Sequence, residues 1–107
     1  MPLPPTNPEQ RAAALEKAAE SRRIRAAELA RIRSGEITVA DVLGSEDSPL
    51  LAVPVRRVLL AVPGIGPARA DALLDAIGVS EQLRTKRRVK GLGEVQRRAL
   101  AAKLAAA

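Results

Sequence analysis

Apolar residues in the first third of the chain do not form a continuous helical stripe, although the composition there favours helix. Residues 8–34 are rich in Ala, Glu, Arg and Leu, which are strong helix formers, and Gly35 is a typical residue just after a helix end. At 100° per residue Leu15 and Leu29 nearly align, but Ile24 falls on the opposite side. We therefore predict a long helix over 8–34 that stands largely in solvent.

Capping signals mark where the first two helices begin. Asn7 is a favourable N-cap, and Gln10 three residues later completes a capping-box pattern. Thr38 and Asp41 repeat that pattern before a short apolar stretch, which predicts a second, short helix ending near Gly44.

The second half of the chain is more strongly patterned. Four apolar residues follow the i, i+3, i+4, i+7 spacing of a helix that faces a core, namely Val55, Val58, Leu59 and Val62. Pro67 can start a further helix that stops at Gly78, Ser80 can cap a short turn, and residues 94–104 have the composition of a final helix. Near this end we expect four apolar residues to pack inward: Leu92, Val95, Leu100 and Leu104.

The chain shows no two-residue alternation of apolar and polar positions, so we predict an all-α fold. A length of 107 residues suits one small domain. Three prolines in the first seven residues disfavour helix there, and the polar stretch 45–49 has the composition of a linker. We expect a flexible tail over 1–7, a helix over 8–34, a short helix and linker over 35–50, and a globular domain over 51–107.

Composition excludes several classes of function. Cys and His are both absent, so disulfides, thiolate nucleophiles, the usual zinc ligands and the commonest general base are missing. No apolar run approaches the roughly 20 residues of a membrane span. We therefore expect a cytoplasmic protein that is not an enzyme and that has no metal, cofactor, membrane or small-molecule substrate.

The net charge of +6 is concentrated in the second half of the chain. Residues 1–50 contain seven basic and eight acidic residues, whereas residues 51–107 contain eleven basic and four acidic ones. Such an uneven distribution points to a polyanionic partner that binds the C-terminal half.

The sharpest local motif is a glycine turn between two predicted helices. Gly64 and Gly66 flank Ile65, and glycine lets a backbone approach a ligand closely. The amides of Ile65, Gly66, Ala68 and Arg69 could then converge on one phosphate at the start of the next helix. A tight interhelical turn without a ligand is the alternative, and a dinucleotide site is disfavoured because no strand precedes the loop.

A second motif is a run of five cations in seven residues with no acid among them: Arg84, Lys86, Arg87, Arg88 and Lys90. Gly91 and Gly93 follow it and echo the first glycine turn. We favour phosphate contact over a merely solvated surface, since phosphates supply much of the sequence-independent affinity for nucleic acids. The predicted contact residues are Gly64, Ile65, Gly66, Arg69, Lys86, Arg87, Arg88, Lys90, Gly91 and Gly93.

Arginines also occur along the first predicted helix, where they alternate with glutamates. Arg22, Arg23 and Arg25 lie close to Glu20 and Glu28 in sequence. We favour a solvated, self-paired helix, and the alternative is that these arginines flank a bound duplex.

Taken together, four segments resemble the actinobacterial integration host factor family. They are LPPTNPEQRAAALEKA at 3–18, LAVPGIGPARA at 60–70, IGVS at 77–80 and RRVKGLG at 87–93. The resemblance implies a long N-terminal helix on a helix-two-turns-helix domain. It also implies a nucleoid protein that bends or constrains double-stranded DNA with little sequence preference and takes part in phage integration complexes. Separately, we expect a monomer. In the family, the glycine turn and the RRVKGLG element meet the DNA backbone.

One position departs from the family pattern. The second glycine of the first turn is commonly followed by Lys, whereas this chain has Pro67, which supplies neither a cation nor an amide donor. We therefore do not expect the first turn to dominate affinity.

The helix-two-turns-helix element also occurs in a small-subunit ribosomal protein and in base-excision glycosylases, so two other classes must be weighed. Glycosylases use an N-terminal proline amine, and Pro2 would be exposed by removal of Met1. Leu3 stands where those enzymes have Glu, and the chain is too short for their catalytic domain. Structured RNA is the stronger alternative, while single strands are disfavoured because there are no aromatic residues for bases to stack on.

Overall fold

The computed structural model describes residues 7–105, and within them the chain is helical with no strand, so the predicted all-α class is confirmed. Three short 3-10 helices, labelled η, lie among the α-helices. In chain order the elements are α1 (Pro8–Ser34), α2 (Val39–Leu43), η1 (Pro49–Ala52), α3 (Val55–Ala61), α4 (Pro67–Ala76), η2 (Glu81–Leu83), η3 (Val89–Gly91) and α5 (Glu94–Ala105). Apart from Asn7, the predicted tail lies outside the described residues, and so does Pro2.

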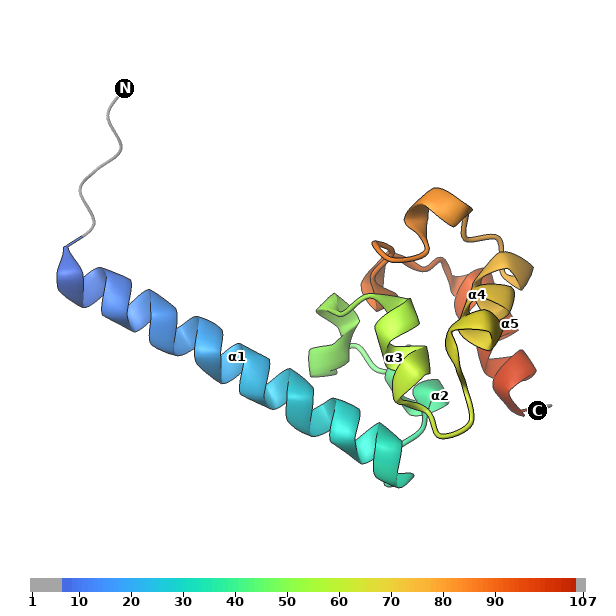
Figure 1. Cartoon of the computed structure of the whole chain (residues 1–107), viewed down its shortest axis with the longest axis horizontal. Coiled ribbons are helices and arrows are strands. Elements are labelled where there is room, and N and C mark those ends of the chain that lie inside the picture. The colour runs from blue at the N-terminus through green and yellow to red at the C-terminus, as the bar shows by residue number, and fades with distance from the viewer. Residues whose placement is uncertain (1–6, 106–107) are drawn as a thin grey trace.

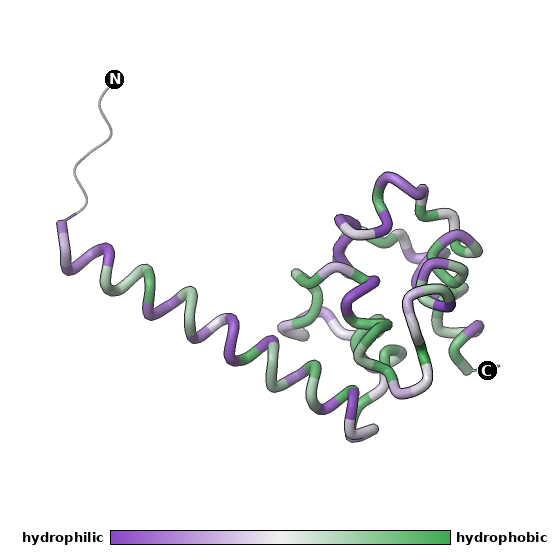
Figure 2. Tube along the Cα trace, viewed as in Figure 1, coloured by the Kyte–Doolittle hydropathy of each residue, from purple (hydrophilic) through white to green (hydrophobic). Residues whose placement is uncertain are grey.

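The long helix α1 projects from a globular body made by the remaining elements (Figure 1). Its capping box forms as expected, because the Asn7 side chain accepts from the Gln10 amide at 2.7 Å and Gln10 accepts from the Asn7 amide. Hydrophilic residues recur along its whole length (Figure 2), and its buried residues, Leu29 and Ile32, lie near its C-terminal end. Only this end is therefore anchored in the core.

One apolar core joins the end of α1 to all the helices that follow it. Its largest fully buried side chains include four leucines: Leu50, Leu59, Leu74 and Leu100. Leu50 belongs to η1, directly after the polar stretch 45–49, so the core continues across this stretch. The division of the chain at residue 51 stays a prediction.

The predicted inward packing of Val95 is wrong, because its side chain is 81% exposed. Leu92 and Leu100 are buried and Leu104 is half-buried, as expected. Leu100 lies five positions after Val95, which turns the two side chains about 140° apart around α5. Val95 therefore faces solvent when Leu100 faces the core.

Two backbone hydrogen bonds hold the basic segment against the start of α3. The Val55 amide donates to the Arg87 carbonyl at 2.8 Å, and the Val89 amide donates to the Val53 carbonyl at 3.1 Å. An isolated antiparallel bridge between Pro54 and Arg88 lies between them. The segment that carries the cations is thus fixed to the helical body over residues 87–89.

Helices α3 and α4 are joined by an ion pair between Arg56 and Asp71, with 2.9 Å between the Arg56 Nε and the Asp71 Oδ1. Among the described helices, none has the length and apolar character that crossing a membrane requires.

Candidate nucleic-acid interface

Two turns in which a buried apolar residue lies between two glycines come before α4 and α5, and we call them hairpin 1 (residues 62–66) and hairpin 2 (residues 89–93). In hairpin 1 the Ile65 amide donates to the Val62 carbonyl at 3.2 Å, and in hairpin 2 the Leu92 amide donates to the Val89 carbonyl at 3.1 Å. Both Ile65 and Leu92 are buried. Each turn is therefore held by an apolar side chain in the core, with exposed glycines on either side of it.

The Ile65 amide is already used by this internal bond, so the expectation that it donates to a phosphate is wrong. Ile65 instead anchors hairpin 1 through its side chain. The amides of Ala68 and Arg69 lie in the first turn of α4, where a helix supplies no carbonyl partner. These amides, with that of Gly66, are the donors that hairpin 1 can offer to an anion.

Glycine is required at one position of hairpin 1 and not at the other. Gly64 has φ +88°, which costs an L-residue about 1–2 kcal/mol, whereas Gly66 has φ −91° and would place an added Cβ in open space. We expect Gly64→Ala to lower the free energy of unfolding by about 1–2 kcal/mol. Gly66→Ala should stay within about 0.5 kcal/mol, because the lost N-cap preference and the stiffer unfolded chain oppose each other.

Urea unfolding followed by circular dichroism measures both glycine variants. Gly66→Ala serves as the control for Gly64→Ala, because both substitutions add one methyl group to the same turn. Equal destabilisation by the two variants would contradict a specific requirement for glycine at position 64.

Hairpins 1 and 2 lie at opposite ends of α3. Residues 87–89 are bonded to the segment just before α3, whereas Val62 directly follows the helix and begins hairpin 1. Seven helical residues at about 1.5 Å each separate these two attachment points by on the order of 10 Å. The ten predicted contact residues therefore form two groups, and most of the charge lies in hairpin 2 and in residues 86–88 just before it.

Hairpin 2 is held by two arginine side chains. The Arg87 Nη1 donates to the Gly91 carbonyl at 3.0 Å, and the Arg97 Nη2 lies 3.5 Å from the Lys90 carbonyl. A Cβ on Gly91 would come within 3.1 Å of the Arg87 Cδ, so the side chain packs directly on the glycine. Arg87 thus supports the turn as well as adding charge, and sequence reasoning missed Arg97, which no local pattern marked.

Arg84 is removed from the predicted phosphate-contacting cluster by an acid on α4. Its Nη2 lies 2.6 Å from both Asp75 oxygens, and this hydrogen bonding raises the pKa of the Arg84 guanidinium above its ordinary value. The run contains no acid of its own, but the fold brings one from nine residues away. Arg84 therefore serves to join the segment to α4.

The remaining four cations of the run have no acidic partner among the described residues: Lys86, Arg87, Arg88 and Lys90. Lys86, Arg88 and Lys90 are exposed, and Arg87 is half-buried. Unpaired cations held on a fixed segment beside a turn create a local positive potential suited to phosphate.

The arginines of α1 fall into two kinds. Arg23 pairs with Glu20, and Arg31 pairs with Glu28 and Glu36, so these follow the self-paired expectation. Side-chain hydrogen bonds raise the pKa of Arg31, and the bond with Glu28 has a larger effect than the bond with Glu36.

Arg25, by contrast, lines a shallow hollow between α1 and η1, and Lys90 of hairpin 2 lines the same hollow. The positive surface therefore reaches from hairpin 2 toward α1. Within the described residues, no group of three or more His, Cys, Asp or Glu side chains could hold a metal ion.

Two glycine turns, each anchored in the core by one apolar residue and each followed by a helix, define a helix-two-turns-helix protein. A family model described as the S13-like H2TH domain matches residues 32–104. The chain belongs to the integration host factor family, as its similarity to curated relatives shows.

The relatives match over most of their length. The integration host factor of Streptomyces coelicolor is 42% identical over 98 residues, covering 90% of this chain and 88% of the relative. The integration host factor of Mycobacterium tuberculosis is 38% identical over 109 aligned positions and covers both chains completely. A solved structure described as sIHF bound to an 8 bp palindromic DNA superposes with a TM-score of 0.71 at 32% identity, covering 82% of this chain and 97% of that one.

Proposed function

We propose that this protein binds double-stranded DNA as a nucleoid protein, with little sequence preference and without catalysing a reaction. The observation that carries the proposal is the set of unpaired cations held beside hairpin 2. The similarity to a chain solved with DNA bound supports it, as do relatives named integration host factor.

Hairpin 2 is the principal contact in this proposal. Lys86, Arg88 and Lys90 neutralise phosphates, while Arg87 keeps the Gly91 carbonyl and the turn in place. The exposed Gly91 and Gly93 let the DNA backbone approach closely. Since phosphate contacts carry no sequence information directly, such an interface binds many sequences with similar affinity.

Hairpin 1 supplies a second and weaker contact through backbone amides. Gly64 sets the shape of the turn, and the amides of Gly66, Ala68 and Arg69 lie at the start of α4. A contact at each end of α3 holds the duplex at two places, which is how a monomer of this size would bend or constrain it. Relatives named integration host factor support the further proposal that the protein joins phage integration complexes.

Structured RNA is the second candidate ligand. The S13-like description of the matched domain favours it, because the same element occurs in a small-subunit ribosomal protein. Phosphate contacts alone do not separate A-form from B-form helices, so the geometry of the groove must decide.

The proposal predicts salt-dependent binding that favours DNA. With about three to four phosphates neutralised, log affinity should fall with log salt at a slope near −2.7 to −3.6. Electrophoretic mobility shift at several salt concentrations, with a DNA duplex and an RNA duplex of matched sequence, measures both the slope and the preference.

Either of two results would overturn DNA as the ligand. A slope shallower than about −2 would be incompatible with this number of phosphate contacts. Tighter binding of the RNA duplex at every salt concentration would favour the ribosomal type of function instead.

A further inference from the structure

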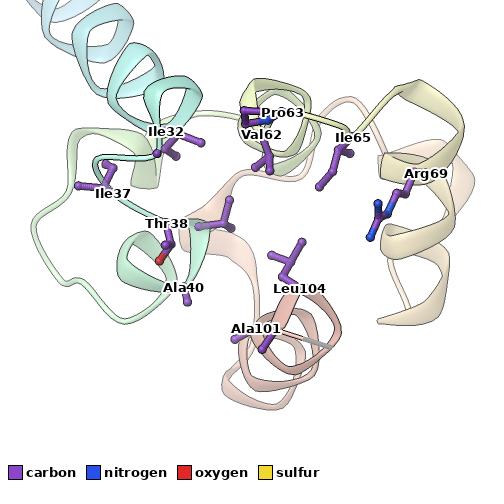
Figure 3. Close-up of a pocket in the computed structure, with 13 residues that line it drawn as sticks. Ile32, Ile37, Thr38, Ala40, Val62, Pro63, Ile65, Arg69, Ala101 and Leu104 are labelled. Carbon is purple, nitrogen blue, oxygen red and sulfur yellow. The ribbon is translucent and has the colours of Figure 1, made fainter. Parts of the chain in front are cut away.

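A half-open cavity of about 510 Å³ lies between the end of α1, hairpin 1 and the end of α5. Ile32 and Ile37 come from the α1 side, Val62 and Ile65 from hairpin 1, and Leu104 from α5 (Figure 3). A volume of this size falls in the range of small-molecule sites. The cavity therefore has room for a small organic molecule.

The walls of the cavity are mainly apolar, and Arg69 is the charged residue that lines it. Its guanidinium points from α4 into the cavity, between Ile65 and Leu104 (Figure 3). Among the described residues, no carboxylate pairs with Arg69. A cavity with an apolar body and one cation at its edge is complementary to an amphipathic anion.

We propose that this cavity binds a small organic carboxylate with an aliphatic body. The hydrocarbon lies among Ile32, Ile37 and Leu104, and the carboxylate accepts hydrogen bonds from the Arg69 guanidinium, whose planar fork matches a carboxylate. This site goes beyond the proposed DNA binding, since it needs no nucleic acid. The experiment that tests this site therefore does not depend on whether the protein binds DNA.

The five isoleucines of the chain make the test specific. Ile32, Ile37 and Ile65 line the cavity, whereas Ile24 and Ile77 do not. The protein is labelled at the isoleucine δ1-methyl groups and titrated with decanoate in the absence of DNA. We expect saturable shifts of the three lining methyl signals while those of Ile24 and Ile77 stay in place.

Comparison of ligands tests the two parts of the proposed ligand separately. Octanoate, which is two methylenes shorter, should bind about 15-fold more weakly than decanoate, since each buried methylene contributes about fourfold. Decanol, which lacks the charge, measures the part played by Arg69. In Arg69→Gln the ratio of decanoate to decanol affinity should fall about fivefold, as expected for one partly exposed ion pair.

Two variants serve as controls. Arg57→Gln removes the same charge from α3 outside the cavity lining and should leave the ratio unchanged. Ala101→Phe, which fills the cavity from α5, should abolish the shifts while the Ile24 and Ile77 signals keep their positions and so report a folded protein. Shifts spread over all five methyl signals, no saturation, or an unchanged ratio in Arg69→Gln would overturn the proposal.

Discussion

The double substitution Arg88→Gln/Lys90→Gln is expected to weaken duplex binding by about 30- to 150-fold. Both side chains are exposed beside hairpin 2 and have no acidic partner within the described residues, so their charge is available to phosphate. A charge-assisted contact at an exposed site contributes on the order of 1–1.5 kcal/mol, and two such contacts give this loss. Fluorescence anisotropy with a labelled duplex measures the affinity.

The dependence on salt gives the double variant a second readout. Loss of two phosphate contacts should make the slope of log affinity against log salt shallower by about two. A smaller change in slope would mean that the two side chains do not both contact phosphates.

The matched control is Lys17→Gln/Lys103→Gln, which also lowers the net charge by two. Lys17 lies on the exposed half of α1 and Lys103 near the end of α5, both away from hairpin 2. We expect less than a threefold change in affinity, because exposed charges beyond about 10 Å are largely screened at 0.1 M salt. Equal losses in the two double variants would mean that net charge, and not hairpin 2, determines binding.

Leu100→Ala is expected to lower the free energy of unfolding by about 2–5 kcal/mol. Leu100 lies on α5 with no exposed surface and belongs to the one core that joins the globular helices. A leucine truncated in such a place loses its transfer free energy and leaves a cavity. Small domains have only about 5–15 kcal/mol in total, so this substitution removes a large share of the stability.

Val95→Ala is the control for this substitution, because Val95 lies on the same helix with 81% of its surface exposed. Its effect should stay within about 0.5 kcal/mol. Urea unfolding followed by circular dichroism at 222 nm suits a chain without aromatic residues. A loss below about 1 kcal/mol in Leu100→Ala, or similar losses in both variants, would contradict the assigned packing of α5.

Val95 and Leu100 also show the limit of a spacing rule applied to sequence. Both residues fit a list of apolar positions in the last helix, yet one faces solvent and the other is fully buried. A short helix with scattered apolar residues has several faces that could turn inward. The neighbours of α5, which include α2 and α4, decide which face is covered.

The amino-acid sequence by itself determined the local structure of this protein. The capping boxes at Asn7 and Thr38, the left-handed Gly35 and the all-α class follow from residues three or four positions apart, which interact wherever the helix is placed. The family motifs likewise lie in short continuous segments. Hairpins 1 and 2 and the concentration of cations could therefore be found before any fold was known.

The tertiary structure alone decided which groups are available to a ligand. Asp75 takes Arg84 out of the basic run, Arg97 approaches the Lys90 carbonyl of hairpin 2, and Arg69 faces a cavity whose walls come from both ends of the chain. Each of these relations joins residues that lie seven or more positions apart. Their distances depend on how the helices pack around the core, and no local pattern contains that information.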